Sequence, residues 1–121
     1  MKVLIVESNP NLAHLWADHM QRSGFDTDIC HSQTTASEFL LENEYKVIVL
    51  NLTLQGGSAL AVADYASYRW PHSQVIFVTG ESFFSDGSIF NHSQNVCAFV
   101  PKATQPDDFT RMVDYYASRA C

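Results

Sequence analysis

The sequence predicts a doubly wound α/β fold, in which helices cover both faces of a parallel sheet. Short apolar runs alternate along the chain with amphipathic stretches at helical spacing. The runs at 3–6, 47–50 and 75–78 contain no polar side chain, as is typical of strands that are buried on both faces. The short connections favour right-handed helical crossovers between parallel strands. The 121 residues are the size of one ordinary domain, and we expect a single domain over 1–121.

The first part of the chain predicts two strand–helix units. After the strand at 3–6, Asn9 and Pro10 mark a helix start, because asparagine is a good cap and proline fits the first turn. Gly24 ends that helix. A weaker strand at 27–30 follows, and Ser32 caps the second helix. The positions at helical spacing in the two helices are Leu12, Leu15, Trp16, His19, Met20, Ala36, Phe39 and Leu40.

The middle of the chain predicts a buried strand at 47–50 that runs directly into Asn51. The helix after it is ended by Pro71, since proline is not tolerated in a helix interior. Its stripe of small side chains is suited to close packing on a sheet, and consists of Ala59, Val62, Ala63 and Ala66. The next strand, at 75–78, ends at Thr79 and Gly80.

The last part of the chain has weaker signals. A fourth helix is expected at 85–93, although glycine, serine and asparagine residues disfavour it. A short strand at 98–100 follows, and Pro106 opens a last helix whose first acidic residues suit the positive helix terminus. The buried stripe of this helix is Phe109, Met112, Val113 and Tyr116. Five such units predict a flavodoxin-like (βα)5 three-layer sandwich with strand order 2-1-3-4-5.

Composition excludes several classes of function. A formal net charge of −6 and a pI near 5.1 argue against direct binding of nucleic acid, which needs a basic face. No apolar stretch approaches the roughly 20 residues that cross a bilayer, so we expect no membrane span. The three cysteines show no metal-like spacing, which predicts no metal centre and reduced thiols in a cytoplasmic protein.

Polar side chains follow several of the predicted strands at the points where the strands end. Glu7 and Ser8 follow the first strand, and Asn51 ends the third. Thr79 ends the fourth, and Lys102 follows the last. Because ligands of doubly wound sheets bind beyond the carboxyl ends of the strands, we expect these groups to converge on one crevice.

Four segments carry a resemblance to a known family. They are Val-Leu-Ile-Val-Glu-Ser-Asn-Pro, Val-Ile-Val-Leu-Asn-Leu-Thr-Leu-Gln-Gly-Gly-Ser, Val-Ile-Phe-Val-Thr-Gly and Ala-Phe-Val-Pro-Lys. In this order, and over the whole chain, they resemble the CheY-like receiver domains of bacterial two-component response regulators. In that family two carboxylates and an acceptor aspartate hold Mg²⁺, and the aspartate accepts a phosphoryl group. A hydroxyl and a lysine then bind the phosphoryl oxygens.

The resemblance implies a role for six positions. Glu7 and Ser8 stand at the acidic pair, Asn51 at the phosphate acceptor, Thr79 at the hydroxyl, Phe99 at the aromatic switch and Lys102 at the lysine. The chain departs from the family at two of them. Asn51 carries a neutral amide, which cannot act as the carboxylate nucleophile, and Ser8 removes a second negative charge. We therefore expect a degenerate receiver with weak or absent Mg²⁺ binding, no cofactor and no catalytic residue.

The resulting expectation is a non-enzymatic module of phosphorelay signalling that binds a protein partner without being phosphorylated. The partner is a sensor kinase, an output domain or a second copy of the chain, and it binds through the last two helices and the last strand, as in the family. With no aspartate at Asn51 we also expect Glu7 to pair with Lys102.

Two alternatives remain open at the level of sequence. The first is a competent receiver that transfers the phosphoryl group to another side chain. The second is a flavodoxin-like binder of a nucleotide or flavin. The second is disfavoured because residues 7–10 do not supply a phosphate-binding loop rich in serine, threonine and glycine.

Overall fold

The computed structural model describes residues 2–55, 57–80 and 95–118, and in them a five-stranded parallel sheet has the order β2-β1-β3-β4-β5. The strands are β1 (Lys2–Val6), β2 (Asp26–Cys30), β3 (Val47–Asn51), β4 (Gln74–Thr79) and β5 (Val96–Pro101). The helices are α1 (Pro10–Arg22), α2 (Gln33–Glu42), α3 (Ala59–Arg69) and α4 (Pro106–Ala117). The predicted fold and strand order are confirmed. The helix expected at 85–93 lies outside the described residues.

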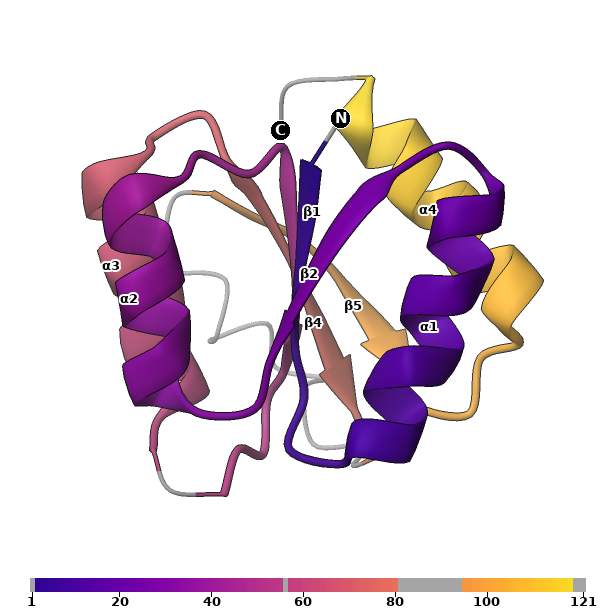
Figure 1. Ribbon diagram of the computed structural model, residues 1–121, viewed down its shortest axis with the longest axis horizontal. Coiled ribbons are helices and arrows are strands. Elements are labelled where there is room, and N and C mark those ends of the chain that lie inside the picture. Colours follow the sequence, from indigo (N-terminus) through magenta and orange to yellow (C-terminus); the bar gives the residue numbers. More distant parts are fainter. Residues whose placement is uncertain (1, 56, 81–94, 119–121) are drawn as a thin grey trace.

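Helices cover both faces of the sheet, with α1 and α4 on one side and α2 and α3 on the other (Figure 1). Every residue of β3 and β4 is buried, because side chains that alternate along these central strands enter two separate cores. Val3 and Ile5 of β1 belong to the core under α1 and α4, whereas Leu4 and Val6 belong to the core under α2 and α3. The sheet is therefore a rigid support for the loops at the two ends of its strands.

The helix starts follow the sequence signals. The Asn9 side chain accepts hydrogen bonds from the amides of Asn11 and Leu12, and Ser32 caps α2 in a similar way. Gly24 adopts a φ of +96°, which a residue with a side chain rarely tolerates, and so it turns the chain after α1. Leu15 shares the helical spacing of the apolar positions of α1 but is 45% exposed, whereas Ala13 and Ala17 are buried in the core.

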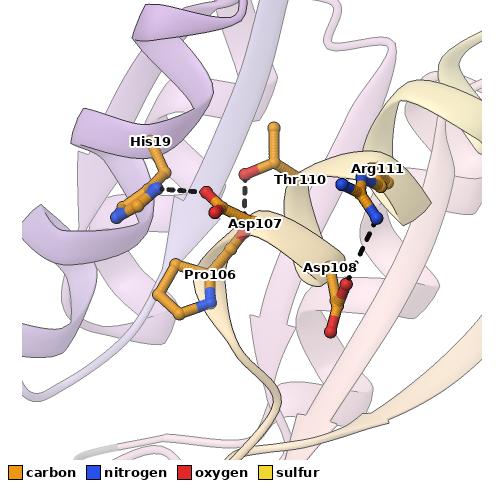
Figure 2. Close-up of polar contacts among 6 residues, drawn as sticks. All are labelled: His19, Pro106, Asp107, Asp108, Thr110 and Arg111. Atoms are coloured by element: carbon orange, nitrogen blue, oxygen red, sulfur yellow. Dashed lines mark hydrogen bonds and ion pairs between the residues drawn. The ribbon is translucent and has the colours of Figure 1, made fainter.

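Helices α1 and α4 are joined at the surface by a hydrogen bond between His19 and Asp107 (Figure 2). His19 Nδ1 lies 3.1 Å from Asp107 Oδ1, and Asp108 lies 3.6 Å from Arg111 one turn along α4. Thr110 donates a hydrogen bond to the Pro106 carbonyl. Because the Asp107 side chain is 81% exposed, its contact with His19 contributes little to stability. The packing of Trp16 of α1 against Phe109 of α4, with ring centroids 5.1 Å apart, is the stronger link.

The cysteines behave differently from one another. Cys30 is a buried free thiol, whereas Cys97 is disulfide-bonded, so the prediction of reduced thiols is wrong for Cys97. Burial, and next the charge of Asp28, raises the pKa of the Cys30 thiol from 9.0 to about 12.

In the part of the chain that the structure describes, no helix has the length and apolar character needed to cross a membrane.

The raised pKa of Cys30 makes stability depend on alkaline pH. The folded state keeps the thiol proton to about pH 12, while the unfolded state loses it near pH 9.0. Stability should therefore fall as pH rises above 9, by about 1.4 kcal/mol per pH unit from this group. Urea unfolding measured at a series of alkaline pH values tests this, and Cys30→Ala should have the shallower slope. Equal slopes for the two proteins would contradict it.

Candidate functional site at the carboxyl edge of the sheet

A polar cavity of about 490 Å³ lies beyond the carboxyl ends of the central strands. Its lining residues come from the last residue of β3 and from the loops after β1, β3, β4 and β5. They are Glu7, Ser8, Asn9, Asn51, Thr53, Gln55, Gly80 and Lys102. Four residues singled out from the sequence, Glu7, Ser8, Asn51 and Lys102, are thus brought together as expected. Thr53 and Gln55 were not singled out for the cavity, because nothing in the sequence fixes which way the loop after β3 turns.

The centre of the site is a hydrogen bond between Asn51 and Glu7. Asn51 Nδ2 donates to Glu7 Oε1 over 2.5 Å, and the backbone amide of Asn9 donates to Glu7 Oε2 over 2.9 Å. Glu7 is only 2% exposed and Asn51 only 5%. A buried carboxylate needs such donors, because hydrogen bonds replace the water that it loses. Both carboxylate oxygens of Glu7 therefore accept a hydrogen bond from the protein itself.

The orientation of the Asn51 amide is set by its other contact. The backbone N–H of Thr53 donates to Asn51 Oδ1 over 2.8 Å, so the oxygen faces that amide and the NH₂ group faces Glu7. An aspartate in the same place would still accept from Thr53, but it would bring a second carboxylate oxygen against Glu7. The neutral amide thus makes this buried arrangement stable without a cation.

The expected ion pair between Glu7 and Lys102 is wrong. Among the ion pairs of the described residues, none joins these two side chains within 4.0 Å. The physical reason is that Asn51 and Asn9 already satisfy the buried Glu7, while Lys102 is exposed and solvated by water. Lys102 still lines the cavity, and its backbone amide donates to the Thr79 carbonyl over 2.7 Å.

Ser8 joins the loops around the cavity. Its hydroxyl accepts from the backbone amide of Gln55 over 2.9 Å and donates to the His31 carbonyl over 3.1 Å. His31 Nδ1 in turn lies 2.8 Å from the Glu7 carbonyl, which requires the proton on Nδ1. Where the family resemblance places a second metal-binding acid, this chain has a hydroxyl that fixes the loop after β3.

A second contact holds the same loop. Gln33 Oε1 accepts from the backbone amide of Ser58 over 2.8 Å, and a Cβ on Gly57 would overlap the Gln33 Cβ. Glycine at 57 therefore allows the close approach of α2 to this loop. The sequence gives no sign of the part played by Gln33, since the contact joins segments that are 25 residues apart.

Thr79 and Phe99, two further residues singled out from the sequence, are not among the residues that line the cavity. Thr79 is buried, and Gly80 rather than Thr79 lines the cavity. Phe99 is partly buried and stacks on Phe77 of β4, with ring centroids 5.4 Å apart and planes 18° from parallel. Phe99 thus forms part of the core under α2 and α3. A switching role for it stays a prediction.

The donor set does not fit a magnesium site. Glu7 is the one carboxylate among the lining residues, and both of its oxygens are occupied. Asn51 presents its NH₂ group, which repels a cation, toward the same carboxylate. Within the described ranges no group of three His, Cys, Asp or Glu side chains could hold a metal ion. Magnesium prefers several oxygen ligands at once, which this arrangement does not offer.

Comparison with known proteins bears on the fold. No protein-family model and no curated protein sequence matches the chain. Solved structures do. A CheY-like response regulator receiver domain protein from Methanospirillum hungatei has a TM-score of 0.88 at 14% identity, over 97% of this chain and 93% of that one. TrrA from Thermotoga maritima, a response regulator in complex with Mg²⁺ and BeF, has a TM-score of 0.82 at 20% identity, over 95% and 97%.

A third structure shows the same unit inside a longer protein. NtrX from Brucella abortus has a TM-score of 0.87 at 18% identity, and the match covers 97% of this chain but 27% of NtrX. The chain therefore has the flavodoxin-like α/β fold of CheY-like receiver domains, with five parallel strands in the order 2-1-3-4-5. The fold is established by these likenesses, while the activity has to be argued from the site.

Proposed function

We propose that this chain is a receiver-type module of bacterial two-component signalling that binds protein partners in the cytoplasm without being phosphorylated at Asn51. The observation that carries the proposal is the hydrogen bond from the Asn51 amide to the buried Glu7 carboxylate. In a receiver, the resemblance would place an acceptor aspartate and a metal ion here. In this chain the Asn51 amide and the Glu7 carboxylate occupy that place and bind one another.

The chemistry of phosphoryl transfer explains why this contact matters. Transfer to a receiver needs a carboxylate nucleophile and a cation that neutralises the charge of the phosphoryl oxygens. Asn51 supplies an amide nitrogen whose lone pair is delocalised, and Glu7 is already paired with it. The chain is accordingly proposed to have no enzymatic activity, and its signalling to depend on shape and surface alone.

The expected partner surface, in the part that the structure describes, carries exposed aromatic and acidic side chains that a protein partner could contact. It consists of β5 and α4, where Tyr115 is 49% exposed and stacks edge-on against Tyr116. Acidic side chains accompany this tyrosine pair along α4, namely Asp107, Asp108 and Asp114. Exposed aromatic side chains are common anchors in protein interfaces, which supports a kinase, an output domain or a second copy as the partner.

The test is incubation with acetyl phosphate and Mg²⁺, followed by measurement of the intact mass. We expect the mass to stay unchanged, while a receiver with an intact acceptor aspartate gains one phosphoryl group under the same conditions. A gain of one phosphoryl group by the wild-type chain would overturn the proposal and favour transfer to another side chain.

A further inference from the structure

Cys97 lies at an irregular point of the last strand. In the register of β4 and β5, Val96 pairs with Val75 and Ala98 pairs with Ile76, so Cys97 is the extra residue of a β-bulge. A bulge bends its strand and re-aims the side chain of the extra residue. Cys97 is half-buried there and belongs to neither of the two hydrophobic cores. Its sulfur therefore lies at the margin of the packed interior.

One buried glutamine links Cys97 to the end of α4. Gln74, the first residue of β4, is 3% exposed, and its Nε2 donates to the Tyr116 carbonyl over 2.6 Å. The Oε1 atom of the same side chain lies 3.3 Å from Cys97 Sγ. A single amide group therefore lies between the Cys97 sulfur and the last turn of α4.

The cysteine content of the chain leaves one disulfide partner for Cys97. Cys97 is disulfide-bonded and Cys30 is a free thiol, so the remaining cysteine of the three is Cys121. Cys121 itself lies outside the described residues. It follows Tyr116 by five residues, which span about 17 Å when they are extended. That reach is ample for a return from the last turn of α4 to Cys97.

The compartment proposed for this chain narrows the role of such a bond. Glutathione and thioredoxin keep cytoplasmic thiols reduced, so the disulfides that do form there are usually transient and either catalytic or redox-sensing. No cysteine is among the residues that line the polar cavity at the carboxyl ends of the strands, which leaves a catalytic role without support. A redox-sensing role is the one that fits a bond beside α4.

We propose that a reversible disulfide between Cys97 and Cys121 fastens the end of α4 to β5, and that reduction of this bond loosens α4. The consequence for signalling rests on the proposed function, because α4 and β5 make up the described part of the expected partner surface. Oxidation then holds this surface in one arrangement, and reduction releases it. The redox state of the cell thereby sets how well the partner binds.

The reductant is a dithiol, and the exchange proceeds in two steps. One thiolate of the dithiol attacks a protein sulfur, breaks the sulfur–sulfur bond and forms a mixed disulfide. The second thiolate then displaces that protein sulfur, and the reductant leaves as a cyclic disulfide. The protein gains two electrons and two protons as two thiols. Glutathione disulfide reverses the change, since it re-forms the protein disulfide and leaves as two molecules of glutathione.

The pairing is tested by trypsin digestion without reductant, followed by mass spectrometry. Trypsin cleaves after Arg69, Lys102 and Arg119, so we expect the peptide 70–102, which contains Cys97, to be joined to the dipeptide 120–121. The protein is first treated with glutathione disulfide. A free thiol at Cys97, a link to Cys30 or a link to a second chain would overturn the proposal.

The effect on α4 is tested by amide hydrogen exchange of the oxidised protein and of protein reduced with dithiothreitol under native conditions. We expect amides of α4 to exchange about tenfold faster, or more, after reduction, and those of α2 to stay unchanged at early times. The melting temperature should fall by about 5 to 15 °C, because the bond no longer restricts the unfolded chain. Equal exchange of α4 in the two states would refute the proposal.

Three variants serve as matched controls. Cys97→Ser and Cys121→Ser should each exchange like the reduced wild type, whether or not dithiothreitol is present. Cys30→Ala should keep the full difference between the oxidised and reduced states. A disulfide that dithiothreitol opens only after denaturation would identify a structural cross-link and contradict a reversible role. None of these readouts involves a phosphoryl group, so this proposal and the proposed function can fail independently.

Discussion

Replacing Asn51 with aspartate is expected to destabilise the protein by about 3 kcal/mol at neutral pH, and Mg²⁺ is expected to restore the loss. The substitution removes the Asn51 NH₂ group, whose hydrogen bond Glu7 accepts over 2.5 Å. It puts a second carboxylate beside Glu7 at a buried position. For a domain of this size the melting temperature should fall by roughly 10 °C. Thermal unfolding with and without Mg²⁺ measures both effects, and the wild type should show no gain with Mg²⁺.

The pH dependence of the Asn51→Asp variant gives an independent check. Repulsion between the two carboxylates raises the pKa of one of them in the folded state above its value in the unfolded chain. The penalty should therefore be small at acidic pH, where one carboxyl is protonated and can donate to the other, and should grow as pH rises. A variant as stable as the wild type at neutral pH without Mg²⁺ would show that the contact with Glu7 does not hold the site together.

The second large effect is expected for Glu7→Gln. A glutamine side chain at this position offers one acceptor oxygen where Glu7 offers two, so its NH₂ group must face either the Asn9 amide or the Asn51 NH₂ group. Rotation of Asn51 would solve this only by giving up the bond from the Thr53 amide. In every arrangement one donor loses its protein partner, and because hydrogen bonds to a charged acceptor are stronger than neutral ones, we expect a loss of about 1 to 3 kcal/mol. Urea unfolding measures the loss.

The double variant Glu7→Gln with Asn51→Asp is the decisive control. The introduced glutamine then accepts from the Asn9 amide and donates to the introduced aspartate, whose other oxygen accepts from the Thr53 amide. Donor and acceptor are exchanged, and every hydrogen bond of the pair is kept. We expect the double variant to recover most of the stability lost in each single variant, as a large coupling energy in a double-mutant cycle. Additive losses would mean that the two side chains do not act on one another.

The site could be predicted in part because its residues occupy fixed places in a repeating pattern. Glu7, Asn51 and Lys102 each follow an apolar run, and parallel strands bring their carboxyl ends to one edge, so the convergence follows from the topology. The choice of partner for Glu7 could not be predicted this way. Coulomb attraction alone pointed to Lys102, but burial made the nearby Asn51 amide the better partner, and only the tertiary structure reveals that burial.

The sequence by itself determined the order of strands and helices, the two cores and the neutral Asn51 at the end of the third strand, because these depend on local periodicity, capping and residue type. The tertiary structure alone decided which loops are joined through Ser8 and Gln33, that Leu15 is exposed, and that Gln74 links Cys97 to the end of α4. These features depend on contacts between residues far apart in the chain, and their distances and burial are set only when the sheet and its helices have packed.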